Sequence, residues 1–175
     1  MLDPLRLRPF AAADLAEVLA INAGAAPGVS RLDSATVLTL MSMASVAWIA
    51  VREGRVAGYL IGFLPSSHYD GEEFLWFRQR RQDFIYVDQI AVASSSRGHG
   101  IGRRFYAELA RWGSTHSCRS IVCEVNLVPP NPESLAFHSA CGFSEVGRLL
   151  VADGREVALM ERAGTQGDAP AAPSR

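Results

Sequence analysis

Residues 84–105 read FIYVDQIAVASSSRGHGIGRRF and pass from a β-branched run to a helical pattern through a loop with three glycines. The run from Phe84 to Val92 is rich in Val, Ile, Tyr and Phe, which favours a strand. The residues that follow Gly102 place apolar side chains at helical spacing, which favours a helix. Strand, glycine loop and helix are therefore predicted to form one continuous unit.

The glycine loop is suited to binding a phosphate group. A strand that enters a helix through such a loop directs several backbone N–H groups and the positive end of the helix dipole at one place. Gly98, Gly100 and Gly102 omit the Cβ atoms that would keep an anion away and permit positive φ. Arg97 and Arg103 add charged donors. We expect a pyrophosphate here; a simple tight turn is the alternative.

Two better-known phosphate loops do not match this sequence. The dinucleotide fingerprint needs a third glycine where this chain has Arg103, and the P-loop ends in Gly-Lys-Ser/Thr, which is absent here. The loop is therefore expected to serve another kind of phosphate-containing ligand.

The rest of the chain alternates apolar strand patterns with helical patterns. Helices are expected over residues 15–24, 32–44, 102–116 and 131–140, and residues 66–83 are expected to form a loop with a short helical turn. Besides the strand already described, strands are expected over Leu2–Phe10, in two runs within 46–65, and over 119–128, 142–151 and 155–162.

Length, composition and charge limit the classes of protein. The chain has 175 residues and is 49% hydrophobic, which predicts one domain over residues 1–162 followed by a Pro-rich, disordered tail over 163–175. Its 17 basic and 18 acidic residues give a formal net charge of −1, so neither nucleic acid nor an anionic membrane is an expected partner.

Cysteine usage and hydropathy indicate the compartment. The three cysteines are few and odd in number, no signal-peptide pattern opens the chain, and the apolar runs are shorter than the roughly 20 residues that span a bilayer. We therefore expect a reduced, cytoplasmic protein.

The glycine loop resembles the acyl-CoA loop of the GNAT superfamily of N-acetyltransferases. That pattern is a strand ending in valine, five residues to Arg or Gln, and then x-x-Gly-x-Gly or Ala. Val92, Arg97, Gly100 and Gly102 fit each position. Residues 131–143, NPESLAFHSACGF, resemble the second signature of the superfamily, Asn-x-x-Ala/Ser-x-x-aromatic-Tyr-x-x-x-Gly-Phe.

The second signature is matched at all but one position. The matching residues are Asn131, Ser134, Phe137, Gly142 and Phe143. The departure is at His138, which stands where the superfamily has tyrosine. Both signatures occur in the expected order, separated by one helix and one strand.

The resemblance, which covers residues 2–162, implies a fold and a cofactor. The fold class is α/β (α+β), with a mixed, mostly antiparallel sheet of about seven strands and about four flanking helices. The cofactor is acetyl-CoA. Backbone N–H groups of the strand before the loop would hold the pantetheine arm and polarise the thioester, and the loop would hold the pyrophosphate. The implied cofactor-binding residues are Ile90, Ala91, Val92, Arg97, Gly98, His99, Gly100, Ile101, Gly102, Arg103, Asn131, Ser134, Phe137 and His138.

Acetylation of an amine needs a base at neutral pH, because alkyl ammonium groups have a pKa near about 10.4. Three residues are candidates for this base, Tyr86, Asp88 and Glu124. Tyr86 and Asp88 lie two apart in one strand and are expected on one face, and Tyr86 stands where certain other members of the superfamily carry their base. Glu124 stands where ribosomal-protein-acetylating members of the superfamily carry a glutamate base, and it is our first candidate. A structural role for either carboxylate, pairing with an arginine or capping a loop, is the alternative.

The departing thiolate of CoA needs an acid, a role that the family tyrosine serves. His138 is expected to replace it, because a histidine is a competent proton donor near neutral pH. The alternative is a histidine that only packs or hydrogen-bonds. His116, Cys118 and Cys123 have a weak metal-like spacing without a fourth ligand, so we expect no metal site.

Acceptor specificity is expected to come from two loop segments, residues 22–33 and 66–81. Tyr69, Trp76 and Phe77 are expected to form a wall of the acceptor site. In the same segment, acidic side chains are expected to attract a cation; they are Asp70, Glu72 and Glu73. The exposed aromatic residues equally suit a homodimer contact.

The leading hypothesis is an N-acetyltransferase that moves an acetyl group from acetyl-CoA to a primary amine by direct attack in a ternary complex. The acceptor would be a small molecule, a peptide or a protein N-terminus. The alternative is a catalytically silent acyl-CoA-binding sensor, which the departure at His138 favours. The presence of Asp88 and Glu124 beside the expected thioester favours the enzyme.

Overall fold

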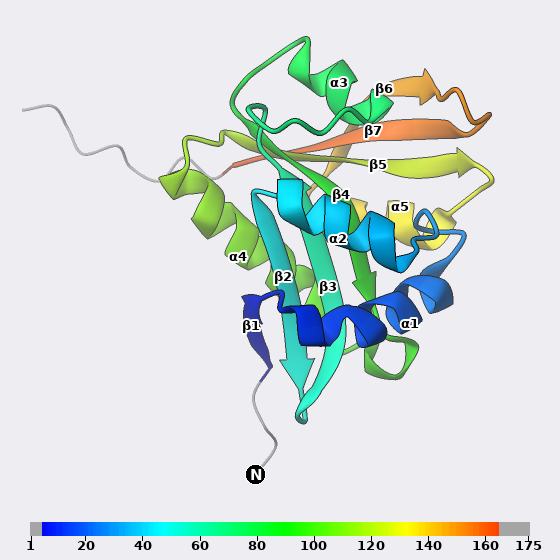
Figure 1. Cartoon of the computed structure of the whole chain (residues 1–175). Helices are drawn as coiled ribbons and strands as arrows, with labels where there is room; N and C mark the ends of the chain where they lie inside the picture. Colours follow the sequence, from blue (N-terminus) through cyan, green and yellow to red (C-terminus); the bar gives the residue numbers. More distant parts are fainter. Residues whose placement is uncertain (1–4, 165–175) are drawn as a thin grey trace, which may run out of the picture.

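The computed structural model describes residues 5–164, and in this part of the chain seven strands form one sheet (Figure 1). The strands are β1 Arg6–Pro9, β2 Val46–Arg52, β3 Arg55–Phe63, β4 Phe84–Val92, β5 Ser120–Val128, β6 Ser144–Leu150 and β7 Glu156–Ala163. The helices are α1 Leu15–Ala25, α2 Ser34–Met43, α3 Glu72–Arg78, α4 Ile101–Thr115 and α5 Pro132–Ala140, with short 3-10 turns at Ala12–Asp14 and Ser94–Ser96.

The sheet has the mixed character that the sequence predicts. Its strand order is β1-β2-β3-β4-β5-β7-β6, and every neighbouring pair is antiparallel except β4 and β5. The expected seven strands are confirmed. Five α-helices flank them instead of about four, because the short turn expected within 66–83 is the seven-residue helix α3. Its Phe74 and Phe77, three residues apart, are both buried in the core.

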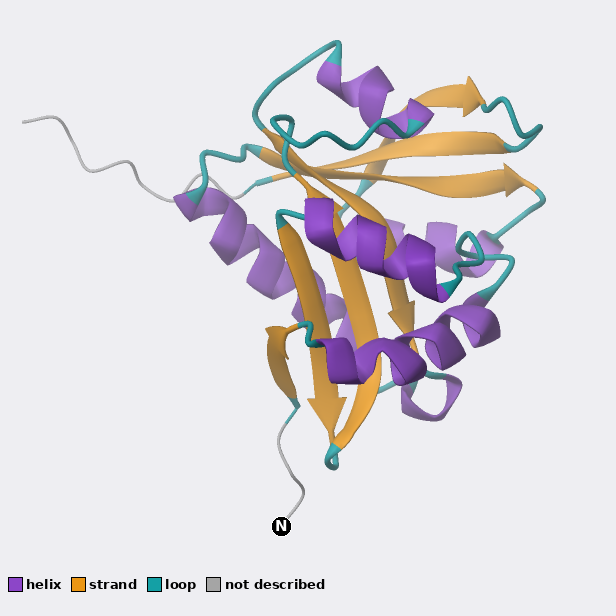
Figure 2. Ribbon diagram, in the orientation of Figure 1, coloured by secondary structure: helices purple, strands orange, loops and turns teal. Residues whose placement is uncertain are grey.

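Helices cover both faces of the sheet (Figure 2). The apolar cluster on one face joins α1, α2 and α3 to side chains such as Tyr59 and Ile61 of β3. The cluster on the other face joins α4 and α5 to the alternate residues, such as Leu60, with Phe105 and Leu109 from α4. Strand alternation sends successive side chains into opposite layers, so the sheet has a hydrophobic core on each side.

The sheet opens between its two parallel strands (Figure 1). Pairing of β4 with β5 extends only over Phe84–Val87 and Ser120–Cys123. At the same point the register of β4 against β3 skips Asp88, since Val87 pairs with Gly62 and Gln89 with Ile61. Such a bulge bends its strand. The bulge at Asp88 thus coincides with the place where β4 leaves β5, and Glu124 is the first residue of β5 beyond it.

Two expectations concern the ends of the chain. The structured part extends past residue 162, because Ala163 pairs with Ser120 in the sheet and Gly164 N donates to Arg119 O. The remainder of the expected tail, 165–175, and residues 1–4 of the first segment lie outside the described residues. Within residues 5–164, no helix is long and apolar enough to cross a bilayer.

Candidate active site

A cavity of about 960 Å³ occupies the opening between β4 and β5. One end, here called the glycine-loop end, is formed by residues 96–98 and 100–103 and by residues of α5 and its N-cap, which are Asn131, Glu133, Ser134, Phe137 and His138. His99, which was expected to bind the cofactor, is exposed and does not line the cavity. The other, here called the carboxylate end, is formed by Tyr69, Glu73, Asp88, Glu124 and Arg155. The separation of β4 from β5 therefore gives one continuous space with two chemically different ends.

The backbone of the glycine loop depends on its first two glycines. Gly98 and Gly100 have φ of 78° and 75°, and a Cβ at either position would meet no other atom within 4 Å. The left-handed conformation, and not crowding, therefore requires glycine there. His99 Nδ1 lies 2.9 Å from the Arg97 carbonyl oxygen, so this histidine holds the loop in shape.

The first turn of α4 supplies backbone donors at this end. Gly100 is the N-cap, and Arg104 N is the first to donate to its carbonyl oxygen. The N–H groups of Ile101, Gly102 and Arg103 therefore have no acceptor within the helix. Arg97 and Arg103 lie beside them with exposed side chains. Within residues 5–164 no carboxylate pairs with Arg97, so the loop fits a diphosphate without displacing an existing ion pair.

Gly102 is a glycine for a different reason from the one that the sequence suggests. It lies inside α4 without a positive φ, and a Cβ there would lie 2.6 Å from Cζ of Phe137. Its small size lets α5 pack on the start of α4, and only Gly98 and Gly100 adopt positive φ in the loop.

The edge of β4 offers further donors to the cavity. Ala93 N donates to Ala57 O on β3, and alternation along the strand directs Ala91 N–H the same way. The N–H groups of Ile90 and Val92 consequently point away from β3, to the side where β5 has departed. Of Ile90, Ala91 and Val92, which were all predicted to bind the cofactor, Ile90 and Val92 direct their backbone N–H groups into the space between β4 and β5.

Residues of the second signature line the glycine-loop end, and some of them have structural partners. Asn131 Oδ1 accepts from Ser134 N at 3.2 Å and caps α5, while Asn131 Nδ2 donates to Gly28 O at 3.5 Å. Asn131 therefore ties α5 to the loop between α1 and α2. Ser134 and Phe137 line the cavity beside it.

His138 is held by hydrogen bonds on both ring nitrogens. Nδ1 lies 2.7 Å from Ser134 O, which can only accept, so this nitrogen carries the proton of the neutral ring. Nε2, at 2.8 Å, then accepts from Tyr106 Oη. The residue is only 3% exposed, and burial lowers its pKa. The imidazole is therefore neutral at pH 7 with its N–H already donated.

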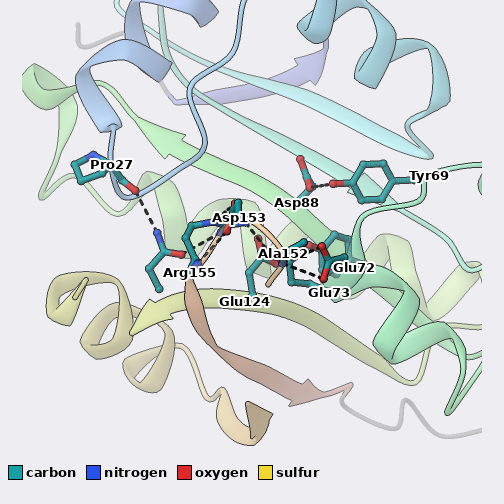
Figure 3. Close-up of polar contacts among 11 residues, drawn as sticks. Pro27, Tyr69, Glu72, Glu73, Asp88, Glu124, Ala152, Asp153 and Arg155 are labelled. Carbon is teal, nitrogen blue, oxygen red and sulfur yellow. Dashed lines mark hydrogen bonds and ion pairs between the residues drawn. The ribbon is translucent and has the colours of Figure 1, made fainter. Parts of the chain in front are cut away.

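At the carboxylate end, two carboxylates are each held by a tyrosine. Tyr69 Oη donates to Asp88 Oδ1 at 2.5 Å, and Tyr86 Oη donates to Glu124 Oε2 at 2.6 Å. Asp88 and Glu124 each come one residue after the last pair between β4 and β5, so they lie on the two strands at the place where these begin to part. Figure 3 draws both with the polar contacts around them.

The environment raises the pKa of both carboxyl groups. Burial raises the pKa of Asp88 to about 6, against the opposing effect of the hydrogen bond from Tyr69. Burial also raises the pKa of Glu124 well above its usual value, and the negative charges of Glu73 and Asp88 raise it further. A carboxylate whose pKa approaches neutrality is a more effective general base than an exposed one.

An ion pair that the sequence does not reveal completes this end (Figure 3). Arg155 Nη2 donates to Glu73 Oε1 at 3.1 Å, Nε to Asp153 at 2.7 Å, and Nη1 to Asn126 Oδ1 at 3.1 Å. Asn126 Nδ2 in turn donates to Pro27 O at 3.2 Å. The turn between β6 and β7 is thus linked to α3 and to the loop between α1 and α2.

The predicted acceptor residues are only partly brought together. Tyr69 lines the cavity, whereas Phe77 is buried in the core and Trp76 packs against Gly147 of β6. Of the acidic residues in the same segment, Glu73 lines the cavity. Asp70 is exposed outside it, and Glu72 accepts from the Ala152 N–H.

A buried polar network fixes one further wall. Asn22 Nδ2 of α1 donates to Ser30 O at 2.9 Å and lies 3.0 Å from Tyr59 Oη, and Leu32 N donates to Asn22 Oδ1 at 2.9 Å. Tyr59 Oη donates to Gln89 Oε1 at 2.8 Å, beside the bulge in β4. The loop between α1 and α2 is therefore anchored directly to the strand that carries Asp88.

A family model identifies the family of the chain. The profile described as "Acetyltransferase (GNAT) family" matches residues 20–143, which is more than half of the chain. The aminoglycoside N(6')-acetyltransferase type 1 of Salmonella typhimurium is 25% identical over 104 residues, which are 59% of this chain and 66% of that protein. The match thus spans slightly less than two thirds of the relative's length.

Solved structures share the fold at low sequence identity. Ard1 from Thermoplasma volcanium superposes with a TM-score of 0.75 at 18% identity, covering 93% of this chain and 99% of that one. A GNAT superfamily phosphinothricin acetyltransferase from Sinorhizobium meliloti, solved with acetyl-CoA, has a TM-score of 0.68 at 23% identity, covering 94% and 92%. Both likenesses concern the fold.

Proposed function

The chain belongs to the acetyltransferase (GNAT) family, and from that premise we propose that it transfers the acetyl group of acetyl-CoA to a primary amine. The observation that carries the proposal is the continuity of the cavity. It joins a loop suited to a diphosphate with two tyrosine-held carboxylates through the opening between β4 and β5. Bound acetyl-CoA would supply an activated thioester.

Residues of the glycine-loop end would bind and orient acetyl-CoA. The N–H groups of Ile101, Gly102 and Arg103, with the side chains of Arg97 and Arg103, suit the diphosphate. The N–H groups of Ile90 and Val92 face the opening and suit the pantetheine amide and the thioester carbonyl. Donors aimed at a carbonyl oxygen stabilise the negative charge that develops there during attack.

Glu124 is the proposed general base. It would accept a proton from the acceptor ammonium, after which the free amine would attack the carbonyl carbon. The C–N bond would form as the C–S bond breaks, and the second proton of the attacking nitrogen would pass to water as the neutral amide forms. Its raised pKa brings it closer to the pKa of an amine, which favours proton transfer. Tyr86, fully buried, donates to Glu124 and serves as its positioning residue, not as the base.

His138 is a positioning residue in this proposal and not the acid that protonates the thiolate. Its Nδ1–H is donated to Ser134 O, its Nε2 accepts from Tyr106, and burial lowers its pKa, so an imidazolium is disfavoured. A CoA thiol has a pKa of about 8.5, so the departing thiolate would take its proton from water. His138 instead holds α5 against α4 beside the cavity.

A silent acyl-CoA-binding module is the second candidate, and the loss of the family tyrosine at His138 is the observation that favours it. Such a module would use only the glycine-loop end. It gives no reason for Asp88 and Glu124 to be kept at a raised pKa in the same cavity. A cytoplasmic location, a homodimer and the choice between small-molecule and peptide acceptors stay predictions.

Mass spectrometry after incubation with acetyl-CoA labelled in the acetyl group tests the proposal. A panel of small amines, peptides and protein N-termini should include acceptors that gain the label, with release of one CoA for each acetyl group transferred. Tight binding of acetyl-CoA by calorimetry with no labelled acceptor and no CoA release would favour the silent module.

A further inference from the structure

We propose that the carboxylate end selects an acceptor with two cationic nitrogens, one that is acetylated and a second that is bound as an ammonium by Asp88 and Glu73. This inference rests on the acetyl transfer proposed above and names the class of acceptor at that site. It makes Asp88 and Glu73 specificity-determining residues, while Glu124 acts on the reacting nitrogen.

Three carboxylates from three separate elements converge here. Glu73 comes from the first turn of α3, Asp88 from the bulge of β4 and Glu124 from β5, and all three line the cavity. Glu73 is only 6% exposed. Its charge raises the pKa of both other groups, so the three are close enough to repel one another.

Arg155 is the single arginine or lysine of the carboxylate end, and three of its five N–H groups already have acceptors in the protein. Its three nitrogens donate to Glu73, to Asp153 and to Asn126. One guanidinium thus faces three cavity carboxylates and Asp153, so the end has an excess of negative charge.

The opposite end of the cavity has the reverse balance. Arg97 and Arg103 and the free N–H groups of α4 stand there against one carboxylate, Glu133. The cavity is therefore polarised, with its positive end suited to phosphate and its negative end suited to ammonium groups. A neutral or anionic acceptor would leave the repulsion among the three carboxylates unrelieved, whereas a dication would relieve it.

The separation of the carboxylates limits the spacing of the two nitrogens. Paired strands lie about 4.8 Å apart, and Asp88 and Glu124 each come one residue after the last pair of β4 and β5, so this spacing is a lower limit for the separation of their backbones. Tyr69 and Tyr86 occupy one oxygen of each carboxylate, which leaves the other oxygen for an ammonium. Two nitrogens joined by a short chain of carbons, as in 1,4-diaminobutane, match this arrangement.

The test compares 1,4-diaminobutane with n-butylamine, which has the same chain and one nitrogen. At pH 8 we expect the wild type to acetylate the diamine with a kcat/KM at least a hundredfold higher. Asp88→Asn and Glu73→Gln should each lower that ratio at least tenfold, mainly through the KM of the diamine. Asp70→Asn is the matched control, because it removes the same charge from an exposed residue of the same segment outside the cavity.

Calorimetry of 1,4-diaminobutane with the CoA-bound protein separates this inference from the proposed function. If Asp88→Asn weakens diamine binding at least tenfold and Asp70→Asn does not, the inference is supported. This holds even if no amine is acetylated, because a lack of acetylation counts only against the proposed acetyl transfer. Equal kcat/KM for the two amines, or equal diamine binding by wild type and Asp88→Asn, would overturn the inference and leave acetyl transfer standing.

Discussion

The two ends of the cavity are built in opposite ways. The glycine-loop end takes its phosphate-binding groups from one stretch of seven residues, Arg97–Arg103, and the second signature adds one short helix. The carboxylate end takes its five side chains from five parts of the chain, from the loop before α3 to the turn before β7. One end is thus a local structure and the other a product of tertiary packing.

This difference has an energetic counterpart. The glycine-loop end uses backbone N–H groups and exposed arginines, which remain hydrated until a ligand binds. The carboxylate end keeps Asp88 and Glu124 in a buried environment that raises their pKa, which is costly for the fold at neutral pH. Variants of the first end should therefore change mainly cofactor affinity, and variants of the second mainly turnover, acceptor choice and stability.

The largest expected effect is at Glu124. Glu124→Gln should lower kcat by about 10²- to 10⁴-fold, the usual contribution of a general base, and leave the acetyl-CoA Kd within about twofold. The loss should shrink as pH rises, because free amine becomes available. Steady-state kinetics from pH 6 to pH 10, with calorimetry for acetyl-CoA, would check both parts. If Glu124→Gln changed the acetyl-CoA Kd and preserved kcat, the carboxylate end would serve cofactor binding and not turnover.

A charge reversal in the glycine loop should have the opposite signature. Arg97→Glu should weaken acetyl-CoA binding by at least tenfold, because a charge-assisted hydrogen bond of about 1.5–3 kcal/mol is lost and a carboxylate faces the phosphates. Arg104→Glu makes the same change of charge on an exposed residue outside the cavity and should leave Kd nearly unchanged. If both variants weakened acetyl-CoA binding equally, the effect would come from the overall electrostatic potential and not from a direct contact of Arg97 with the phosphates.

His138 tests whether a titrating side chain also operates at the glycine-loop end. His138→Phe should cost about 1–3 kcal/mol of stability, because the buried Tyr106 hydroxyl loses its acceptor. Adding Tyr106→Phe should restore part of that loss. The single-turnover rate should keep its alkaline limb in His138→Phe; disappearance of the limb would instead make His138 the general acid.

The smallest expected effect concerns stability and pH at Asp88. Its folded pKa of about 6 lies above the unfolded value of 3.8, so the folded state binds more protons in between and loses stability as pH rises through this window. Asp88→Asn should therefore unfold with a free energy higher by on the order of 1–3 kcal/mol at pH 8, and the gain should vanish at pH 4.

Urea denaturation at the two pH values measures this gain, with Asp70→Asn as the exposed control. An Asp88→Asn variant that is less stable at both pH values by the same amount would mean that the charge-assisted bond from Tyr69 outweighs the burial of the charge.

The sequence alone determined what short-range patterns encode. The β-branched run, the two glycines with positive φ and the cap of α5 each depend on neighbours within a few residues, so the strand, loop and helix were predictable. Family membership followed from the same contiguous residues. Glu124 and Asp88 were candidates because a carboxylate inside an apolar strand is unusual.

Tertiary structure alone decided what these residues contact. The bulge at Asp88 and the parting of β4 from β5 depend on strand register, which no local pattern specifies. Arg155 meets Glu73 across 82 positions of sequence, and His138 meets Tyr106 across 32. Trp76 and Phe77 were expected at the acceptor wall, but the sequence does not specify which face of their helix points to the cavity. In the structure Trp76 packs against β6 and Phe77 is buried in the core. Pairings at such separations arise only when the sheet brings distant segments together, which is why the carboxylate end could not be read from the sequence.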